Sequence, residues 1–260
     1  MSLLVATDLD GTLLPYDSDS VPPYTAEVLR RADAAGVPIV FVTARPLRWM
    51  EPLWRYVGEH GRAIVSNGAI TYDVHRRTPV AVSGIDPGPG LELVAAIAES
   101  VPGASFAVEC LDGIRQDPHW EEPYHLPADA VRGPLAEVWD ATAVKLLVRA
   151  PGSSADVLRD GVVAAVGDLA TPTWSVPGLM EISATGVTKA SALVALCAGL
   201  GVEAADVVAF GDMPNDIPML AWAGTSYAMA DAHESVREVA DHVAPPCADE
   251  GVAQVLATLL

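Results

Sequence analysis

Short apolar runs, rich in β-branched residues, alternate with amphipathic stretches at both ends of this chain, and that alternation constrains its fold more than any other feature. In the first third, strands are predicted at residues 3–7, 39–42 and 63–66, with helices at 24–35 and 46–57 between them. Strands that alternate with helices form a parallel sheet whose two faces are both covered. The sequence therefore predicts an α/β fold with a Rossmann-like parallel-sheet core.

The last third of the chain resumes this pattern. A helix is predicted at residues 189–200, a strand at 207–210, a helix at 217–222 and a closing helix from Gly251. This segment continues the same sheet, and ligands of such sheets bind beyond the carboxyl ends of the strands. Polar residues that directly follow the predicted strands are therefore the candidate functional residues.

The middle of the chain has a different character. Residues 83–90 are rich in proline and glycine, and the segment that follows mixes helical stretches with alternating strands. We expect a core domain of residues 1–82 and 186–260, and an inserted α/β domain of residues 83–185. Within the insertion, helices are predicted at residues 91–100, 128–139 and 153–166, and strands at 105–110, 143–149, 171–175 and 179–183.

Composition and charge limit the binding partners and the cellular location that we expect for this protein. The 260 residues carry a formal net charge of -19, which disfavours binding to nucleic acid or to an anionic membrane surface. No apolar run approaches the ~20 residues of a membrane-spanning helix, and Asp8 follows the apolar start too closely for a signal peptide. Cys110, Cys197 and Cys247 lack a Cys-x-x-Cys spacing, which argues against a disulfide framework or a zinc site. We expect a cytoplasmic protein, either a monomer or a homodimer.

The segment Asp8-Leu9-Asp10-Gly11-Thr12 directly follows the first predicted strand. Carboxylates two residues apart project to the same side of an extended chain, and Gly11 permits the turn that holds them at the edge of the sheet. Such a pair is costly without a cation, so the spacing predicts Mg2+ as well as a nucleophile. Asp8 would attack phosphorus to give an aspartyl phosphate, and Asp10 would serve as general acid and then base. The alternative is that both acids only cap a turn.

A hydroxyl and several backbone N–H groups follow the second predicted strand. Thr43 and Ala44 stand where a helix is expected to begin, so they could hold phosphate oxygens, or Thr43 could simply cap the helix. Arg45 could reach a substrate group or complete a surface ion pair, and the sequence does not choose between these roles.

Two further clusters lie in the last third of the chain. Lys189 stands at a predicted helix start, where a positive charge opposes the helix dipole; this indicates a role such as neutralising a phosphoryl group, with a solvated lysine as the alternative. Asp212, Asn215 and Asp216 follow the strand at residues 207–210 and could complete an oxygen-rich Mg2+ shell opposite Asp8. Four polar clusters are thus predicted to meet at one edge of one sheet.

These four segments resemble the haloacid dehalogenase superfamily, and their order and the point of insertion resemble its Cof-type branch, subfamily IIB, in which a square α/β cap of the C2 type follows the third core strand. The resemblance spans nearly the whole chain. It implies a HAD-like core in which Asp8 is the nucleophile and Asp10 the general acid and base. It also implies Mg2+ bound by the Asp8 carboxylate, the Asp10 carbonyl and Asp212, with Asp216 supporting the metal from the second layer.

The resemblance implies phosphate and substrate contacts as well. Phosphate would meet the Leu9 amide, Thr43, Ala44, Lys189 and Asn215. Asn67 and Gly68, in a loop after the third strand, would lie near the hinge and the substrate entrance, and Arg45 is a further candidate for substrate contact.

The chain departs from the pattern of this branch at two positions. Thr7 stands where many relatives carry an aromatic residue, and Ala44 replaces the usual glycine. Neither change removes a reacting group, so we expect the effect of Ala44 to fall on fit and rate.

The resulting interpretation is a Mg2+-dependent phosphomonoester hydrolase for a small phosphorylated metabolite, with a sugar phosphate as the substrate that the resemblance favours. One alternative is a phosphotransferase or phosphomutase that shares the aspartyl phosphate. Another is a phospho-accepting, receiver-type signalling module, although receivers are about half this length and order their acids differently.

The insertion offers only weak candidates for the binding of sugar hydroxyls. A solvated loop is the alternative for the Pro-containing stretch at residues 117–127. The candidate side chains are Glu109, Asp112, Arg115, His119, Trp120 and His125.

Overall fold

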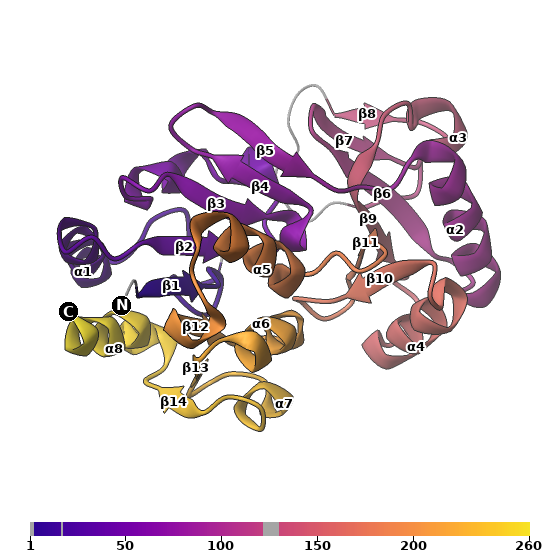
Figure 1. Ribbon diagram of the computed structural model, residues 1–260. Helices are drawn as coiled ribbons and strands as arrows, with labels where there is room; N and C mark the ends of the chain where they lie inside the picture. The colour runs from indigo at the N-terminus through magenta and orange to yellow at the C-terminus, as the bar shows by residue number, and fades with distance from the viewer. Residues whose placement is uncertain (1–2, 17, 122–129) are drawn as a thin grey trace. The chain divides into compact units, whose positions relative to one another are not determined.

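The computed structural model describes residues 3–16, 18–121 and 130–260. The chain divides into two compact units, one formed by Met1–Ala81 with Thr188–Leu260 and the other by Val82–Val187. The first unit is therefore built from both ends of the sequence, and Figure 1 shows the two ends of the chain within it. Each unit is described separately below.

The first unit is built on a sheet with the strand order β14-β13-β12-β1-β2-β3-β4-β5. Adjacent strands from β14 to β3 are parallel, whereas β4 runs antiparallel to β3. The central strands are buried on both faces, which explains their continuous apolar sequences. The strands are β1 (Leu4–Thr7), β2 (Ile39–Val42), β3 (Arg62–Val65), β4 (Ile70–Asp73), β5 (Thr78–Val82), β12 (Val207–Gly211), β13 (Thr225–Met229) and β14 (His242–Ala244).

Helices pack around this sheet in pairs: α1 lies beside α8, and α5 lies beside α6 (Figure 1). The expected α/β fold with a parallel-sheet core is thereby confirmed. The helices are α1 (Pro23–Ala34), α5 (Lys189–Leu200), α6 (Ile217–Trp222), α7 (Glu234–Arg237) and α8 (Gly251–Leu259).

Local sequence fixes where α5 begins and ends. The Thr188 hydroxyl accepts a hydrogen bond from the Ser191 N–H at 3.0 Å. In return, the Ser191 hydroxyl accepts a hydrogen bond from the Thr188 N–H at 2.9 Å. This reciprocal cap satisfies two of the N–H groups that a helix start leaves unpaired. Gly201 ends the helix in the left-handed conformation. Lys189 is therefore held as the first residue of α5.

One helix expected in this unit is absent. Residues 46–57, predicted as a single helix, form two short 3₁₀ helices, η1 (Leu47–Trp49) and η2 (Glu51–Tyr56). Pro52 has no N–H with which to continue an α-helical ladder, and the Leu53 N–H donates to the Met50 carbonyl three residues earlier. The segment is helical in short turns, but the proline prevents a single α-helix.

The second unit contains a sheet with the strand order β10-β11-β9-β6-β7-β8, antiparallel except for the β7–β8 pair. Helices α2 and α4 pack together, and their apolar residues form one core with side chains of β6 and β9. The elements are α2 (Pro87–Ser100), β6 (Ser105–Cys110), β7 (Gly113–Gln116), β8 (Val131–Arg132), α3 (Leu135–Val138), β9 (Ala143–Arg149), α4 (Ala155–Val166), β10 (Ala170–Thr173) and β11 (Met180–Ala184).

The helix predicted at residues 128–139 was wrong over most of its length. Residues 128 and 129 lie outside the described residues, Val131–Arg132 pairs as β8, and only Leu135–Val138 is helical. Pro134 stands immediately before α3 and cannot sit inside a regular helix, so a single helix cannot run through it. Gly133 adds to the break because glycine disfavours helix interiors.

All three cysteines are unpaired and buried. Within the ranges that the structure describes, no helix is both long enough and apolar enough to cross a bilayer.

Two hydrogen bonds fix the orientation of the His60 ring. Its Nε2 lies 2.8 Å from the Ile39 carbonyl oxygen, and its Nδ1 accepts from the Arg62 N–H at 3.1 Å. Burial lowers the pKa of His60 below its ordinary value of 6.5, although the Ile39 carbonyl opposes the shift. Above pH 6.5 the ring is neutral in both the folded and the unfolded chain, so the contribution of His60 to stability is then fully present.

We expect the free energy of unfolding to lose this contribution as the pH falls through 6.5, because the unfolded chain then binds a proton that folded His60 resists. Chemical denaturation of the wild type and of His60→Gln at about pH 7.5 and about pH 5.5 measures the effect. The wild type should lose more stability between the two pH values than the variant. An equal loss in both proteins would contradict the prediction.

Candidate active site

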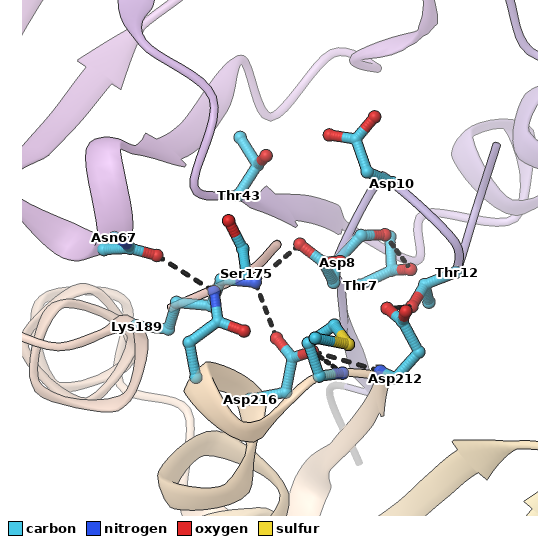
Figure 2. A network of polar contacts seen from close by, with 12 residues as sticks. Thr7, Asp8, Asp10, Thr12, Thr43, Asn67, Ser175, Lys189, Asp212 and Asp216 are labelled. Carbon is cyan, nitrogen blue, oxygen red and sulfur yellow. Dashed lines mark hydrogen bonds and ion pairs between the residues drawn. The ribbon is translucent and has the colours of Figure 1, made fainter. Parts of the chain in front are cut away.

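The carboxyl ends of three neighbouring strands bring the predicted residues together. Asp8 follows β1, Thr43 follows β2 and Asp212 follows β12, and these strands are adjacent in the sheet. Because parallel strands end at the same edge, residues separated by about two hundred positions become neighbours. Figure 2 shows this group from close by, with Lys189 and Asp216 beside Asp8.

Lys189 is the centre of the polar network. Its Nζ donates to Asp8 Oδ1 at 2.5 Å and to Asp216 Oδ1 at 2.6 Å. The lysine side chain is 1% exposed, and the Asp216 side chain is 0% exposed, so both ion pairs lie out of reach of bulk water. An unpaired charge in such a place would be strongly destabilising. The position of Lys189 at the start of α5 is thus explained by two carboxylates rather than by solvation.

Asp216 also organises the loop that carries Asp212. Its Oδ2 accepts hydrogen bonds from the N–H groups of Asp212 and Met213, each at 3.0 Å. Asp216 ends the short helix η5 (Pro214–Asp216), so its carboxylate turns back onto the loop that follows β12. One carboxylate therefore ties the Asp212 loop to Lys189.

The electrostatic balance of this cluster is unfavourable by itself. Burial raises the pKa of Asp8 well above its ordinary value of 3.8, Lys189 opposes this shift, and the carboxylates of Asp216 and Asp212 add to it. Burial and Asp216 together raise the pKa of Asp212 to about 6. Burial alone would lower the pKa of Lys189, but its pairs with Asp216 and Asp8 outweigh burial and raise it. Three buried carboxylates thus share one ammonium group.

The donor set fits a hard divalent cation. Among the described residues, Asp8, Asp212 and Asp216 each offer a carboxylate oxygen, and these oxygens all lie within 4.8 Å of one another. Mg2+ prefers oxygen ligands, and a double positive charge would compensate the carboxylates that Lys189 leaves unbalanced. The geometry therefore groups Asp216 with the predicted ligands Asp8 and Asp212.

Asp10 has a partner that sequence analysis did not identify. Arg45 binds its carboxylate at two points, with Nε 2.8 Å from Oδ2 and Nη2 2.6 Å from Oδ1. Burial opposes protonation of Arg45, but the bonds to Asp10 outweigh burial and raise its pKa. Arg45 also donates to the Ser18 carbonyl at 2.8 Å. Of the two roles left open for Arg45, the structure shows an ion pair, and the pair is with a candidate catalytic residue.

The Asp10 carboxylate consequently points away from the cluster around Lys189 (Figure 2). The bidentate pair with the guanidinium fixes the plane of this carboxylate. Leu9, between the two acids, is fully buried, and its carbonyl accepts from the N–H groups of residues 12–14. The turn after β1 therefore holds Asp8 and Asp10 in different directions.

Thr43 does not cap a helix. Its hydroxyl accepts from the Arg45 N–H at 3.0 Å, and its carbonyl accepts from the Asn67 N–H at 3.0 Å. Ala44 is half-buried between Thr43 and Arg45. The Ser66 N–H donates to the Arg45 carbonyl, so the loops after β2 and β3 are joined by two backbone hydrogen bonds. Thr43 and Asn67 are thereby positioned by each other.

Asn67 links this loop to the loop after β12. The Nδ2 group of Asn215 donates to Asn67 Oδ1 at 3.1 Å. Ser66 and Asn67 both adopt positive φ values, 52° and 56°, which are uncommon for residues other than glycine. Consecutive residues in this conformation are typical of segments whose surroundings hold them in place, and they cluster at functional sites. Asn67 and Asn215, predicted separately, are thus in direct contact.

Two residues in this site were not predicted. Thr12 donates to Asp212 Oδ1 and Tyr16 to Asp212 Oδ2, each at 2.7 Å. Thr12 lies within the segment that marked Asp8 and Asp10, but its spacing gave no indication of its partner. No sequence signal distinguishes Tyr16.

In the second unit, two of the weak candidates, Asp112 and Arg115, pair with each other. Arg115 binds Asp112 at 2.7 Å and Asp140 at 2.9 Å, and Trp120 is 1% exposed within a small apolar cluster. Asp117 accepts from the His119 N–H at 2.6 Å, as in a turn. His125 lies outside the described residues.

A parallel α/β sheet with an Asp-x-Asp segment after its first strand, and with a lysine and further aspartates at the neighbouring strand ends, is the arrangement of haloacid dehalogenase-like hydrolases. The model of that family, haloacid dehalogenase-like hydrolase, matches residues 5–256. The chain belongs to this family and is therefore an enzyme of the hydrolase class.

Phosphatases are among the known proteins to which the chain is similar over nearly its whole length. Phosphoglycolate phosphatase of Methanothermobacter thermautotrophicus is 26% identical over 252 residues, covering 97% of this chain and 96% of that protein. Pyridoxal phosphate phosphatase of Escherichia coli is 26% identical over 264 residues, covering 97% of each. The solved structure of a sugar phosphatase of haloacid dehalogenase subclass IIB has a TM-score of 0.82 at 21% identity, covering 99% of this chain and 98% of that one.

Gly68 gives a test of how tightly the loop after β3 is held. Its φ is +99°, and a Cβ placed there would lie 2.1 Å from the Thr188 carbonyl oxygen, the cap of α5. We expect Gly68→Ala to lower the free energy of unfolding because it adds both backbone strain and a clash with a rigid backbone atom.

The matched control is Gly36→Ala, where φ is +74° but no atom lies within 4 Å of the added Cβ. Chemical denaturation should show that Gly68→Ala costs about 1–3 kcal/mol more than Gly36→Ala, the typical cost of overpacking. Equal losses in the two variants would mean that the loop can move away from α5.

Proposed function

We propose that this protein is a Mg2+-dependent phosphomonoester hydrolase that acts on a small phosphorylated metabolite through an aspartyl phosphate on Asp8. The observation that carries the proposal is the buried Asp8 carboxylate at the end of β1, paired with Lys189 and surrounded by two further acids. A carboxylate in this setting is a nucleophile that water does not screen, and the adjacent cation can stabilise the charge of a transferring phosphoryl group.

Each side chain and backbone group of the site has a distinct role in this mechanism. One carboxylate oxygen of Asp8 attacks phosphorus. The bond between phosphorus and the leaving oxygen breaks as the aspartyl phosphate forms. Lys189 neutralises negative charge on the phosphoryl oxygens, and the Leu9 amide, Thr43, Ala44 and Asn215 provide further donors. The Nδ2 group of Asn215 carries two hydrogens, so the bond to Asn67 leaves one for phosphate.

Asp10 is assigned to proton transfer. It protonates the leaving oxygen and later takes a proton from the water that hydrolyses the aspartyl phosphate. Arg45 makes an ion pair with Asp10 in the arrangement described above, so Asp10 must leave this pair or share it during proton transfer. Arg45 is accordingly assigned the role of setting the resting position of Asp10.

Mg2+ would be held by the Asp8 carboxylate, the Asp10 backbone carbonyl and Asp212, with Asp216 behind them. When bound, the ion supplies positive charge that offsets the acids and the incoming phosphate. The support for this assignment is the excess of buried carboxylate over ammonium groups at the site.

A sugar phosphate is the substrate class we favour. The support is the match in fold to the subclass IIB sugar phosphatase, whereas the named relatives act on phosphoglycolate and on pyridoxal phosphate. All three names describe phosphatases of small phosphorylated molecules. They support a small phosphorylated metabolite as substrate more strongly than they support a sugar phosphate in particular.

The proposal is tested by measuring release of inorganic phosphate from a panel of phosphorylated sugars, phosphoglycolate and pyridoxal phosphate. Each substrate is assayed with Mg2+ and with excess chelator, and without any added acceptor. We expect phosphate release that requires Mg2+. Transfer that appears only when an acceptor alcohol is added would instead indicate a phosphotransferase, and no turnover of any ester would contradict both.

Asp8→Asn should reduce turnover to below about a thousandth of wild type, because the amide keeps the shape of the side chain but cannot attack phosphorus. The fold should be retained, since the change removes one of three buried carboxylates around a single lysine and so relieves repulsion. Phosphate-release assays and chemical denaturation check the two parts. Asp168→Asn, at an exposed position of the second unit, is the control for loss of a carboxylate.

Lys189→Ala should cost about 2–4 kcal/mol of transition-state stabilisation, or roughly 30-fold to 10³-fold in kcat, by analogy with removal of an oxyanion-hole donor. Lys145 is the only other lysine in the sequence, and it also forms a buried ion pair, with Glu181. Lys145→Ala therefore controls for loss of a buried pair as such. Steady-state kinetics at a temperature where both variants are folded gives the comparison, and an unchanged rate in Lys189→Ala would remove this lysine from the site.

A further inference from the structure

Two hydroxyl groups hold the two carboxylate oxygens of Asp212. Thr12 Oγ1 donates to Oδ1 at 2.7 Å, and Tyr16 Oη donates to Oδ2 at 2.7 Å. Figure 2 shows Asp212 beside Thr12. The terminal torsion of an aspartate is broad when nothing restrains it. With one donor on each oxygen, rotation of the carboxylate would break both hydrogen bonds, so its plane is fixed.

The tight turn after β1 brings Tyr16 to this place. The Gly11 N–H donates to the Leu14 carbonyl at 2.9 Å, which folds the chain back on itself before Pro15 and Tyr16. A Cβ on Gly11 would lie 2.5 Å from Asp212 Oδ2 and 2.7 Å from Tyr16 Oη. Only glycine, with its φ of +79° and no side chain, leaves room for the phenol and the carboxylate to meet.

Packing does not account for the position of Tyr16. The residue is 51% exposed, whereas Thr12 is 1% exposed and belongs to the interior of the turn. A residue that is half exposed buries only part of its apolar surface in the fold. Its hydroxyl nevertheless reaches a carboxylate that is itself 4% exposed. The contact is therefore directed at Asp212 rather than at the core.

We propose that Tyr16 is a positioning residue for the metal ligand Asp212, and that its hydroxyl presets the carboxylate for binding of Mg2+. This inference rests on the proposed function, because it takes Asp212 as a ligand of the ion. A carboxylate oxygen accepts more than one partner, so a hydrogen bond from Tyr16 leaves lone pairs on Asp212 free for a cation. Partners of this kind orient metal ligands, and their removal typically costs about 10-fold to 100-fold in metal affinity.

The opposite possibility is that the phenol occupies the place of the ion and must leave before Mg2+ binds. The two cases predict changes of opposite sign in the affinity for Mg2+ when the Tyr16 hydroxyl is removed. Tyr16→Phe keeps the ring over Gly11 and deletes only the donor, so it separates them. Tyr24→Phe is the matched control, because Tyr24 is a 43% exposed tyrosine on α1, outside the site described above.

Isothermal titration of Mg2+ into the metal-free, substrate-free protein measures the affinity directly. We expect the dissociation constant of Tyr16→Phe to rise by about 10-fold to 100-fold, with Tyr24→Phe unchanged. The metal-free melting temperature of Tyr16→Phe should stay close to that of wild type, whereas its rise on addition of Mg2+ should shrink. In kinetics, the Mg2+ concentration for half-maximal rate should increase, while kcat at saturating Mg2+ returns to within about twofold of wild type.

An unchanged or a lower dissociation constant in Tyr16→Phe would overturn the inference, and the lower value would establish that the phenol competes with the ion. Asp212→Asn is titrated alongside to separate this failure from failure of the proposed function. If wild type binds Mg2+ and Asp212→Asn does not, a wild-type affinity in Tyr16→Phe counts against Tyr16 alone. If wild type binds no Mg2+, both the inference and the metal dependence of the proposed function are wrong.

Discussion

The site depends on one buried ammonium group shared between two carboxylates. Lys189 reaches Asp8 at the end of β1 and Asp216 in the loop after β12, so it ties together α5 and two strands of the sheet. Burying any of these charges alone would cost several kcal/mol, which makes the three groups interdependent. Asp212 joins them as a third carboxylate, and the negative charge that Lys189 leaves unbalanced suits the cluster to binding a cation.

Four aspartates in this region lie in three different hydrogen-bonding environments. Asp8 and Asp216 share Lys189, Asp10 is held by Arg45, and Asp212 accepts two hydroxyl groups. Environments that differ in this way give identical side chains separate chemical roles. The backbone contributes as well, since the loops after β2 and β3 are joined through Thr43, Arg45 and Asn67. A rigid edge of the sheet therefore supports a set of acids that are individually tuned.

Much of the fold follows from the sequence because its apolar periodicity is strong. The strands near residues 3–7, 39–42, 63–66 and 207–210, and the helix from Lys189, all lie where the pattern placed them. The errors at residues 46–57 and 128–139 share one cause: Pro52 and Pro134 lack the N–H that a continuous helix needs. Strands β4, β5, β7, β8, β13 and β14 were not predicted, since short strands at or next to the edges of a sheet carry little periodicity.

The sequence by itself determined the class of fold and the identity of the polar residues at the strand ends, because both depend on local pattern: alternating apolar segments, and acids or hydroxyls directly after them. Only the tertiary structure decided how those residues pair. Asp212 accepts hydrogen bonds from Thr12, 200 positions away in the sequence, and from Tyr16, 196 positions away. Arg45 binds Asp10, 35 positions away. Such pairings depend on the order of the strands in the sheet and on the direction that the chain takes in the turn after each strand. The spacing of residues along the chain determines neither of these.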